Sequence, residues 1–233
     1  MVAPILDTSG HDDIPNSGLA YPETVVTNGP NELVVLVVQL NSTTPTGVSD
    51  SDGNVWHGPV PGFKTNGVLS VYWAAKPLAG TMTMTIAFPS DLHLKLFWFT
   101  LQGADLSNPG FAPLTVIGPV QGATLTFGPF TDPNSDDFIF AYGDEVMGAG
   151  LAPPTANSPF AILTGDNGGF YSHADWLAYF RQTAPLSNQV FDPLTFPISQ
   201  QIAGSLAAIR AGTGGPPPPP PIPTKLTVTV TPV

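Results

Sequence analysis

Cysteine is absent from this sequence. Its absence excludes disulfide bonds, thiolate metal sites and thiol nucleophiles together. A chain of 233 residues does not need such cross-links, because a domain of this size buries roughly 70% of its unfolded surface. A fold without disulfides is also consistent with assembly in a reducing cytoplasm.

Charged residues are scarce, at 10% of the chain compared with about 25% in ordinary soluble domains. Only six residues are basic and 17 are acidic, which gives a net charge of -11. Because so few cations cannot neutralise a phosphate backbone, this composition argues against nucleic-acid binding. The low charge instead indicates a surface that is apolar, rich in threonine or covered by partners.

Long apolar runs and several catalytic motifs are also missing. No stretch approaches 18 consecutive apolar residues, so we expect no membrane insertion. Residues Met1–Asp7 lack the basic and apolar regions of a secretory signal, and we therefore expect none. Neither a G-x-S-x-G elbow nor an H-E-x-x-H motif occurs, and we expect no cofactor.

The sequence is rich in glycine and proline, with 24 and 28 residues, and these separate short apolar runs. Short apolar runs separated by glycine and proline predict an all-β protein. Glu32–Leu40 is a continuous β-branched run, which is typical of a strand buried on both faces. Thr81–Phe88 alternates methionine, isoleucine and phenylalanine with threonine or alanine, which predicts a half-buried strand.

Further strands are predicted at 68–75, 93–101, 123–127, 137–142, 159–163 and 176–181. Ile198–Ile209 fits either a helical stripe or a strand face, and we favour the strand because Gly204 costs a helix about 1 kcal/mol. The regions 104–122 and 143–158 read as long surface connections. About eight to ten strands fit a two-sheet antiparallel sandwich of jelly-roll or lectin-like type.

The C-terminus differs from the rest of the chain. Pro216–Pro221 is an unbroken proline run, which predicts a stiff polyproline II rod of roughly 20 Å. Lys225–Val233 then shows the threonine/valine alternation of a half-buried strand, and a single strand is not stable in water. We therefore predict a C-terminal proline-rich arm whose strand completes a sheet elsewhere. Two alternatives fit the same pattern. The strand could fold back onto its own domain, or its partner domain could lie outside this chain.

This interpretation divides the chain into four parts. They are an N-terminal extension (1–19), a β-sandwich domain (20–212), a Gly/Pro-rich linker with the polyproline run (213–224) and a strand arm (225–233). The residues of the arm expected to bind the partner are Lys225, Leu226, Val228 and Val230.

One motif is similar to a known family. Asp50–Trp56 reads D-S-D-G-N-V-W, follows the buried strand, and precedes Ser70–Gly80 and the threonine-rich Thr81–Phe88. This order resembles a widespread β-sandwich domain of phage virion and bacterial surface proteins, which has a D-S-x-G-N-x-W turn and a W-Y-A-x-N-x-x-A-G hairpin.

The likeness covers roughly residues 20 to 210, and it departs at Lys76, where asparagine is usual, and at Gln102-Gly103, which lacks a preceding glutamate and tyrosine. It implies a jelly-roll-like or lectin-like structural or adhesive module, and it carries no catalytic residues.

Two acidic clusters raise the question of a metal. Asp50 and Asp52 begin like a calcium loop, but Val55 and Pro61 occupy the positions where an EF-hand requires glycine and glutamate. We predict a tight turn in which Asp50 and Asn54 bind backbone amides, while a different calcium site stays open. His11-Asp12-Asp13 lies near a terminus, and we assign it no metal.

The segment Gly165–Trp176 is the best candidate for a ligand loop. It combines Asp166 and Asn167, which form hydrogen bonds, with the aromatic rings of Tyr171 and Trp176, a mixture that suits sugar recognition. The alternative is an Asn-Gly-Gly hairpin turn whose aromatic residues pack into the core.

These observations lead to a functional hypothesis. We expect a non-enzymatic structural protein of a phage particle, a decoration protein of the capsid or tail located in the virion and assembled in the host cytoplasm. Its partners would be other virion proteins, further copies of itself, and possible cell-surface glycans. The alternatives are a carbohydrate-binding adhesin and, third, a glycoside hydrolase, for which Asp50 and Asp52 are the one carboxylate pair able to share a face.

Overall fold

The computed structural model describes residues 2–40, 43–61, 68–90, 93–146, 152–166 and 173–212. Within these ranges every regular element is a β-strand, which confirms the all-β prediction. The strands are β1 (Ile5–Ile14), β2 (Ala20–Thr27), β3 (Glu32–Leu40), β4 (Gly47–Asp50), β5 (Trp56–His57), β6 (Val68–Lys76), β7 (Gly80–Ala87), β8 (Leu94–Gln102), β9 (Leu114–Asp132), β10 (Phe138–Val146), β11 (Thr155–Ala156), β12 (Ala161–Asp166), β13 (His173–Arg181) and β14 (Leu186–Ile209).

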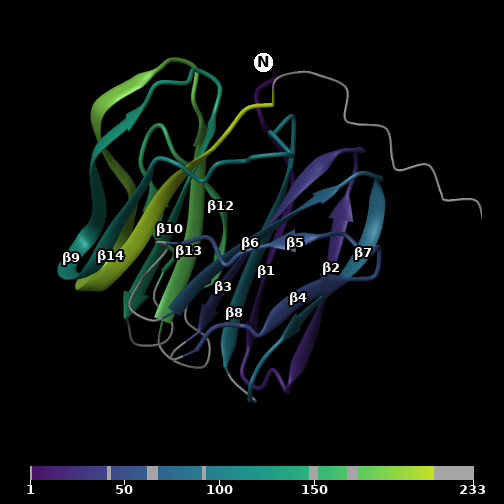
Figure 1. Ribbon diagram of the computed structural model, residues 1–233. Helices are drawn as coiled ribbons and strands as arrows, with labels where there is room; N and C mark the ends of the chain where they lie inside the picture. Colours follow the sequence, from purple (N-terminus) through teal and green to yellow (C-terminus); the bar gives the residue numbers. More distant parts are fainter. Residues whose placement is uncertain are drawn as a thin grey trace, which may run out of the picture.

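The strands form three antiparallel sheets that lie side by side (Figure 1). A five-stranded sheet with the order β1-β8-β3-β6-β5 occupies the middle. A three-stranded sheet, β2-β7-β4, covers one of its faces, and a sheet with the order β11-β14-β10-β13-β12 covers the other. Strand β9 extends this last sheet by pairing with β14.

Strand β3 is buried along its whole length because it lies between two hydrophobic cores. Leu33, Val35 and Val37 pack towards the sheet that contains β10. Val34 and Leu36, on the opposite face, pack towards β7. The predicted burial of both faces is therefore confirmed, and it arises because a strand presents alternate residues to opposite faces.

Strand β7 is half-buried, as its alternation predicts. Met82, Met84 and Ile86 are buried against the middle sheet, whereas Thr81 and Thr83 are exposed. Strand β8, in contrast, is buried on both faces, since Phe97 and Trp98 enter different cores.

The sheet formed by the second half of the chain curls around a core of its own. β14 pairs with β9, β10 and β11, and β11 lies beside β12, so the curled sheet is nearly closed like a barrel. Its interior is rich in phenylalanine, with Phe127, Phe130, Phe160, Phe180 and Phe191 among the packed residues. The preference for a strand at Ile198–Ile209 is confirmed, because this segment is the end of β14.

The strands form three sheets where two were expected. The expected connection 143–158 contains the end of β10 and the short strand β11. Two further segments also differ from the expectations. The expected N-terminal extension, 1–19, contains β1, which pairs with β8 at the edge of the middle sheet. The expected connection 104–122 contains the first part of β9. Both strands carry polar or exposed residues at most positions, so neither gives a clear hydrophobic period.

The two ends of the described fold lie together. Val2 pairs with Gly212, and the Gly212 backbone N–H donates to the Gly103 carbonyl over 2.7 Å. The predicted linker and arm, 213–224 and 225–233, lie outside the described residues. In the part of the chain that the structure describes, no helix has the length and apolarity needed to cross a membrane.

Candidate functional site

The predicted ligand loop is only half described, and its two described residues face opposite sides of one sheet. Asp166, at the end of β12, forms an ion pair with Lys95 of the middle sheet. Trp176 of β13 packs over Gly165, where an added Cβ would lie 2.3 Å from the indole ring, and against the phenylalanine-rich core. Asn167 and Tyr171 lie outside the described residues. The structure therefore does not bring Asp166 and Trp176 together in one site.

Lys95 is the centre of a buried ionic cluster between the middle and curled sheets. Its side chain is 1% exposed, and its Nζ lies 2.8 Å from Asp166 Oδ2 and 2.9 Å from Asp175 Oδ2. Tyr142, which is fully buried, donates its hydroxyl hydrogen bond to the Asp175 carboxylate. This cluster joins β8 to β12, β13 and β10 across the layer.

Burial controls the proton affinity of this cluster. Burial and the nearby Asp144 charge raise the pKa of Asp175, whereas the Lys95 cation lowers it, and the resulting pKa is about 6. Burial also disfavours the charged form of Lys95, but the carboxylates of Asp175 and Asp166 reverse this effect and raise the Lys95 pKa. On the other face of β10, burial and the Asp144 charge raise the pKa of Glu145 to about 7.

A second acidic cluster lies where β1 and β2 meet. Tyr21 donates a hydrogen bond of 2.9 Å to Asp12 Oδ2, and Trp98 Nε1 donates one of 3.0 Å to Glu23 Oε1. Burial raises the pKa of Glu23 to about 7, and a hydrogen bond with Asp12 contributes in the same direction. Asp12 and Glu23 therefore form a hydrogen-bonded carboxyl pair in which the protonated form of Glu23 is favoured.

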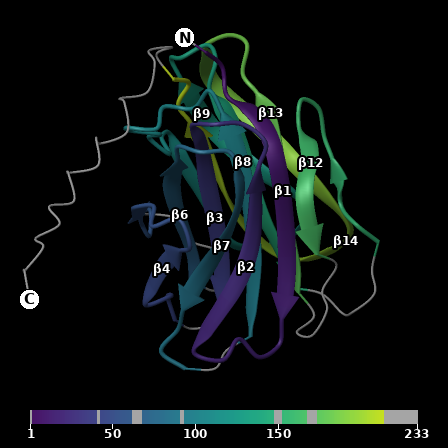
Figure 2. The same ribbon diagram turned by 90° about the vertical axis from the view of Figure 1, so that its right-hand side faces the viewer.

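His11, Asp12 and Asp13 do not act as one cluster. His11 Nδ1 lies 2.8 Å from Thr164 Oγ1, Asp12 accepts from Tyr21, and Asp13 contacts His93. Figure 2 shows β1 beside β12, where the two halves of the chain meet. Alternation along β1 directs successive side chains to opposite faces, which separates Asp12 from its neighbours.

Asp50 organises the D-S-D-G-N-V-W turn, which connects β4 of one sheet to β5 of another. Its Oδ1 accepts from the backbone N–H groups of Asp52 and Asn54 over 2.9 and 3.1 Å. Its Oδ2 accepts from Asn54 Nδ2 at 3.1 Å and from Trp56 Nε1 at 2.7 Å. Lys76 forms an ion pair of 2.5 Å with Asp52. The predicted tight turn, with Asp50 bound to backbone amides, is confirmed, whereas the Asn54 side chain donates to Asp50 and Met82 rather than bonding a backbone amide.

The described residues offer no group of three or more metal-binding side chains. The four hydrogen bonds at Asp50 and the ion pair at Asp52 give these carboxylates a structural role in the turn.

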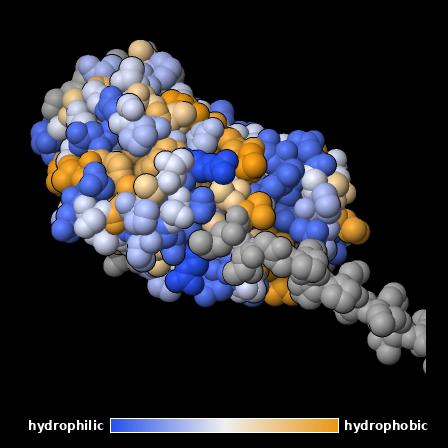
Figure 3. Space-filling view, turned by 90° about the horizontal axis from the view of Figure 1, so that it is seen from above, coloured by the Kyte–Doolittle hydropathy of each residue, from blue (hydrophilic) through white to orange (hydrophobic). Residues whose placement is uncertain are grey.

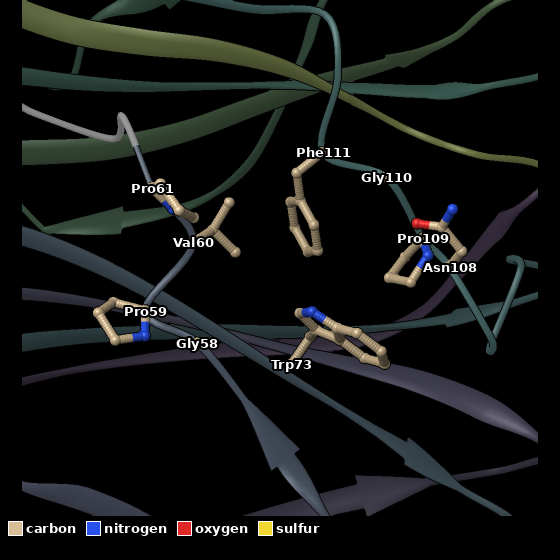
Figure 4. A pocket seen from close by; sticks show the side chains of 9 residues that line it. All are labelled: Gly58, Pro59, Val60, Pro61, Trp73, Asn108, Pro109, Gly110 and Phe111. Carbon is tan, nitrogen blue, oxygen red and sulfur yellow. The ribbon is translucent and has the colours of Figure 1, made fainter.

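An apolar pocket lies beside the short strand β5, and sequence reasoning did not identify it. It has a volume of about 200 Å³ and carries no charged side chain. Figure 4 shows Trp73 on one side, Phe111 on another, and proline rings from two separate loops around them. The lining residues are Gly58, Pro59, Val60, Pro61, Trp73, Asn108, Pro109, Gly110 and Phe111.

Local backbone geometry builds both walls of this pocket. Gly58 has a φ of +132°, and an added Cβ would lie 2.7 Å from the Val71 carbonyl, so only glycine fits this close approach. Val60 then donates its backbone N–H to the same carbonyl over 2.7 Å. On the opposite wall, the Arg210 N–H donates to the Pro109 carbonyl over 2.9 Å, which attaches this wall to the end of β14.

A long surface strand is also uncharged. No charged residue occurs from Leu106 to Thr131, and this range includes nearly all of β9. Among the described strands β9 pairs with β14 alone, and Val116, Val120 and Val190 of these two strands are exposed. Figure 3 shows the end of the molecule where the described chain finishes, with apolar residues in separate patches between hydrophilic ones.

The fold and these sites were compared with known proteins. No family model, no curated protein and no solved structure matches this chain.

Proposed function

We propose that this chain is a non-enzymatic structural protein of a phage particle, which decorates the capsid or tail and attaches through its C-terminal strand arm. Its partners are other virion proteins and further copies of the same chain. The D-S-D-G-N-V-W turn and the hairpin that follows it, which resemble those of virion and surface domains, motivate this proposal.

The hydrogen bonds that hold Gly212 support this proposal. The described residues form three hydrophobic cores. Gly212, the last described residue, is held by hydrogen bonds to Val2 and Gly103, so the position of its backbone is fixed. A stiff proline run followed by a strand sequence suits pairing with the sheet of a neighbour, because main-chain hydrogen bonds supply the affinity.

The roles of the acidic residues favour a structural protein over a hydrolase. Asp50 accepts four hydrogen bonds within a turn, and Asp52 is paired with Lys76. A glycosidase instead requires two carboxylates about 5 to 9 Å apart beside a bound sugar. The carbohydrate-binding alternative gains little support, because Asp166 and Trp176 make their contacts on opposite faces of a sheet.

Deletion of residues 213–233 tests the proposal. We expect the shortened chain to keep its circular dichroism spectrum and melting temperature, and to be lost from particles assembled in its presence. Val228→Pro, which removes a backbone donor from the arm, is expected to reduce loading, whereas Thr224→Pro, which precedes the strand sequence, should not. Full occupancy by the deleted chain would refute the role of the arm.

A further inference from the structure

We propose that the apolar pocket around Trp73 binds the proline run of the same chain, Pro216–Pro221, in the polyproline II conformation. This inference stands independently of a role in a virus particle. It assigns a ligand class, an uncharged proline-rich segment, to a site that is formed by three separate parts of the sequence.

The chemistry of the lining matches this ligand. Trp73 and Phe111 provide aromatic surfaces, and Pro59, Pro61 and Pro109 provide further flat rings. Proline-rich segments bind to aromatic-lined grooves because their extended helix exists before binding and loses little entropy. All nine lining residues are uncharged, as is the proline run, so binding requires no desolvation of an ion.

The dimensions also favour one or two proline rings over a larger ligand. Pockets that enclose drug-sized molecules usually have volumes of about 300–1,000 Å³. The pocket described here has a volume of about 200 Å³. It therefore suits a side chain inserted from a segment that lies across its mouth.

Two polar groups at the pocket suit the backbone of such a segment. A polyproline helix has no internal hydrogen bonds, so its carbonyl oxygens accept hydrogen bonds from outside. Figure 4 shows the ring nitrogen of Trp73 on the side that faces Val60 and Phe111, and the Asn108 amide at one end of the pocket. Both side chains are N–H donors. His57 stacks on the Trp73 ring, with centroids 4.1 Å apart, and fixes its orientation.

The end of the described chain lies next to this pocket. Arg210 donates its backbone N–H to the carbonyl of Pro109, a lining residue, and its side chain packs against Gly110, another one. Gly110 has a φ of +86°, a backbone conformation that favours glycine, and it lies directly against the Arg210 side chain.

From Gly212, three residues separate the described fold from Pro216. Three extended residues span at most about 10 Å, and six prolines add about 19 Å. The proline run therefore begins within reach of the wall that Pro109 and Gly110 form, which favours the chain's own run over that of a second copy.

Pulsed electron spin resonance on the full chain tests this inference. Because the chain has no cysteine, Thr126→Cys and Thr224→Cys provide two unique positions for spin labels, one exposed on β9 and one just after the proline run. We expect a narrow distance distribution that persists when the labelled chain is diluted with unlabelled chain. Loss of the narrow component on dilution would show binding between copies and would overturn the assignment to the same chain.

Variants of the pocket distinguish a bound run from one that is merely stiff. Trp73→Leu removes the indole from the pocket. If this variant does not fold, Pro61→Ser replaces it, because Pro61 is an exposed lining residue. Pro77→Ser is the matched control, since Pro77 is exposed and lies outside the pocket. We expect the distribution to broaden at least twofold for the pocket variants alone. Equal widths in folded Pro61→Ser, Pro77→Ser and unsubstituted chains would overturn the proposal.

Discussion

The Lys95 ammonium lies 2.9 Å from the Asp175 carboxylate, and the two side chains are 1% and 0% exposed. This ion pair lies in the layer between the middle and curled sheets, where water cannot replace a lost partner. Removal of one member of a buried pair is costly because it leaves the other charge without compensation.

Lys95→Met is therefore expected to lower the free energy of unfolding by about 3–5 kcal/mol, as measured by urea denaturation at pH 7. The effect should become smaller at pH 5, because protonation of Asp175, whose pKa burial raises to about 6, removes the isolated charge. Lys76→Met is the matched control. Its partner, Asp52, is 35% exposed and can regain water, so we expect a loss of about 1 kcal/mol. Equal losses for the two substitutions would contradict the assigned role of burial.

Asp50 provides a second test, because its carboxylate accepts hydrogen bonds from Asp52, Asn54 and Trp56. Asp50→Ala leaves these donors without a partner and should reduce the free energy of unfolding by about 3 kcal/mol. A change in tryptophan fluorescence is also expected, since Trp56 Nε1 loses its acceptor. Asp52→Ala removes the Lys76 ion pair and the Ser51 hydrogen bond but keeps the acceptor of Trp56, so it should leave the tryptophan fluorescence unchanged.

Calcium distinguishes this structural role from metal binding at the same turn. With both Asp50 oxygens engaged by N–H donors, millimolar calcium or a chelator is expected to leave the melting temperature unchanged. An increase in melting temperature that Asp50→Ala abolishes would instead support the calcium alternative.

Strong hydrophobic patterns allowed much of the fold to be predicted. The continuous run of β3 predicted burial on both faces, and the alternation of β7 predicted one buried face. β1 was missed because both of its faces hold polar groups such as His11 and Asp12, which form hydrogen bonds with Thr164 and Tyr21. Such partners are distant in the sequence, so no local period reveals them.

The sites were harder to predict than the strands. The turn at Asp50 was found because its hydrogen bonds are local, within six residues. The ionic cluster combines Lys95 with Asp175, 80 positions later, and the pocket combines Trp73 with two loops. Only the packing of separate sheets brings these residues together.

Trp176 allows a test of the ligand-loop hypothesis. Because its ring packs over Gly165 and against the curled sheet's core, Trp176→Ala is expected to reduce the free energy of unfolding by about 3 kcal/mol. Trp176→Phe, which keeps an aromatic ring, should cost less. A glycan array on the parent chain and on the folded Trp176→Phe variant then separates a core role from a ligand-binding role. If the parent chain binds a glycan and the variant does not, the carbohydrate-binding alternative is favoured.

The carboxyl pair of Asp12 and Glu23 predicts how stability depends on pH. Burial raises the pKa of Glu23 from 4.5 to about 7, so folding favours its protonated form. The resulting stabilisation is complete below pH 4.5 and is lost as the pH rises towards 7. Glu145, whose pKa burial also raises to about 7, acts in the same direction. In contrast, the Lys76 hydrogen bond lowers the pKa of Asp52, a contribution that is lost only in strong acid. The urea midpoint should therefore be higher at pH 5 than at pH 8.

Glu23→Gln isolates this contribution, because the amide oxygen still accepts from Trp98 and the amide nitrogen donates to Asp12 without titrating. We expect the variant to equal the parent chain near pH 5 and to exceed it at pH 8, which flattens the fall in the urea midpoint. Asp192→Asn, at an exposed position of β14, is the control and should leave the pH profile unchanged. If Glu23→Gln kept the full slope between pH 5 and pH 8, the buried carboxyl of Glu23 would be ruled out as its source.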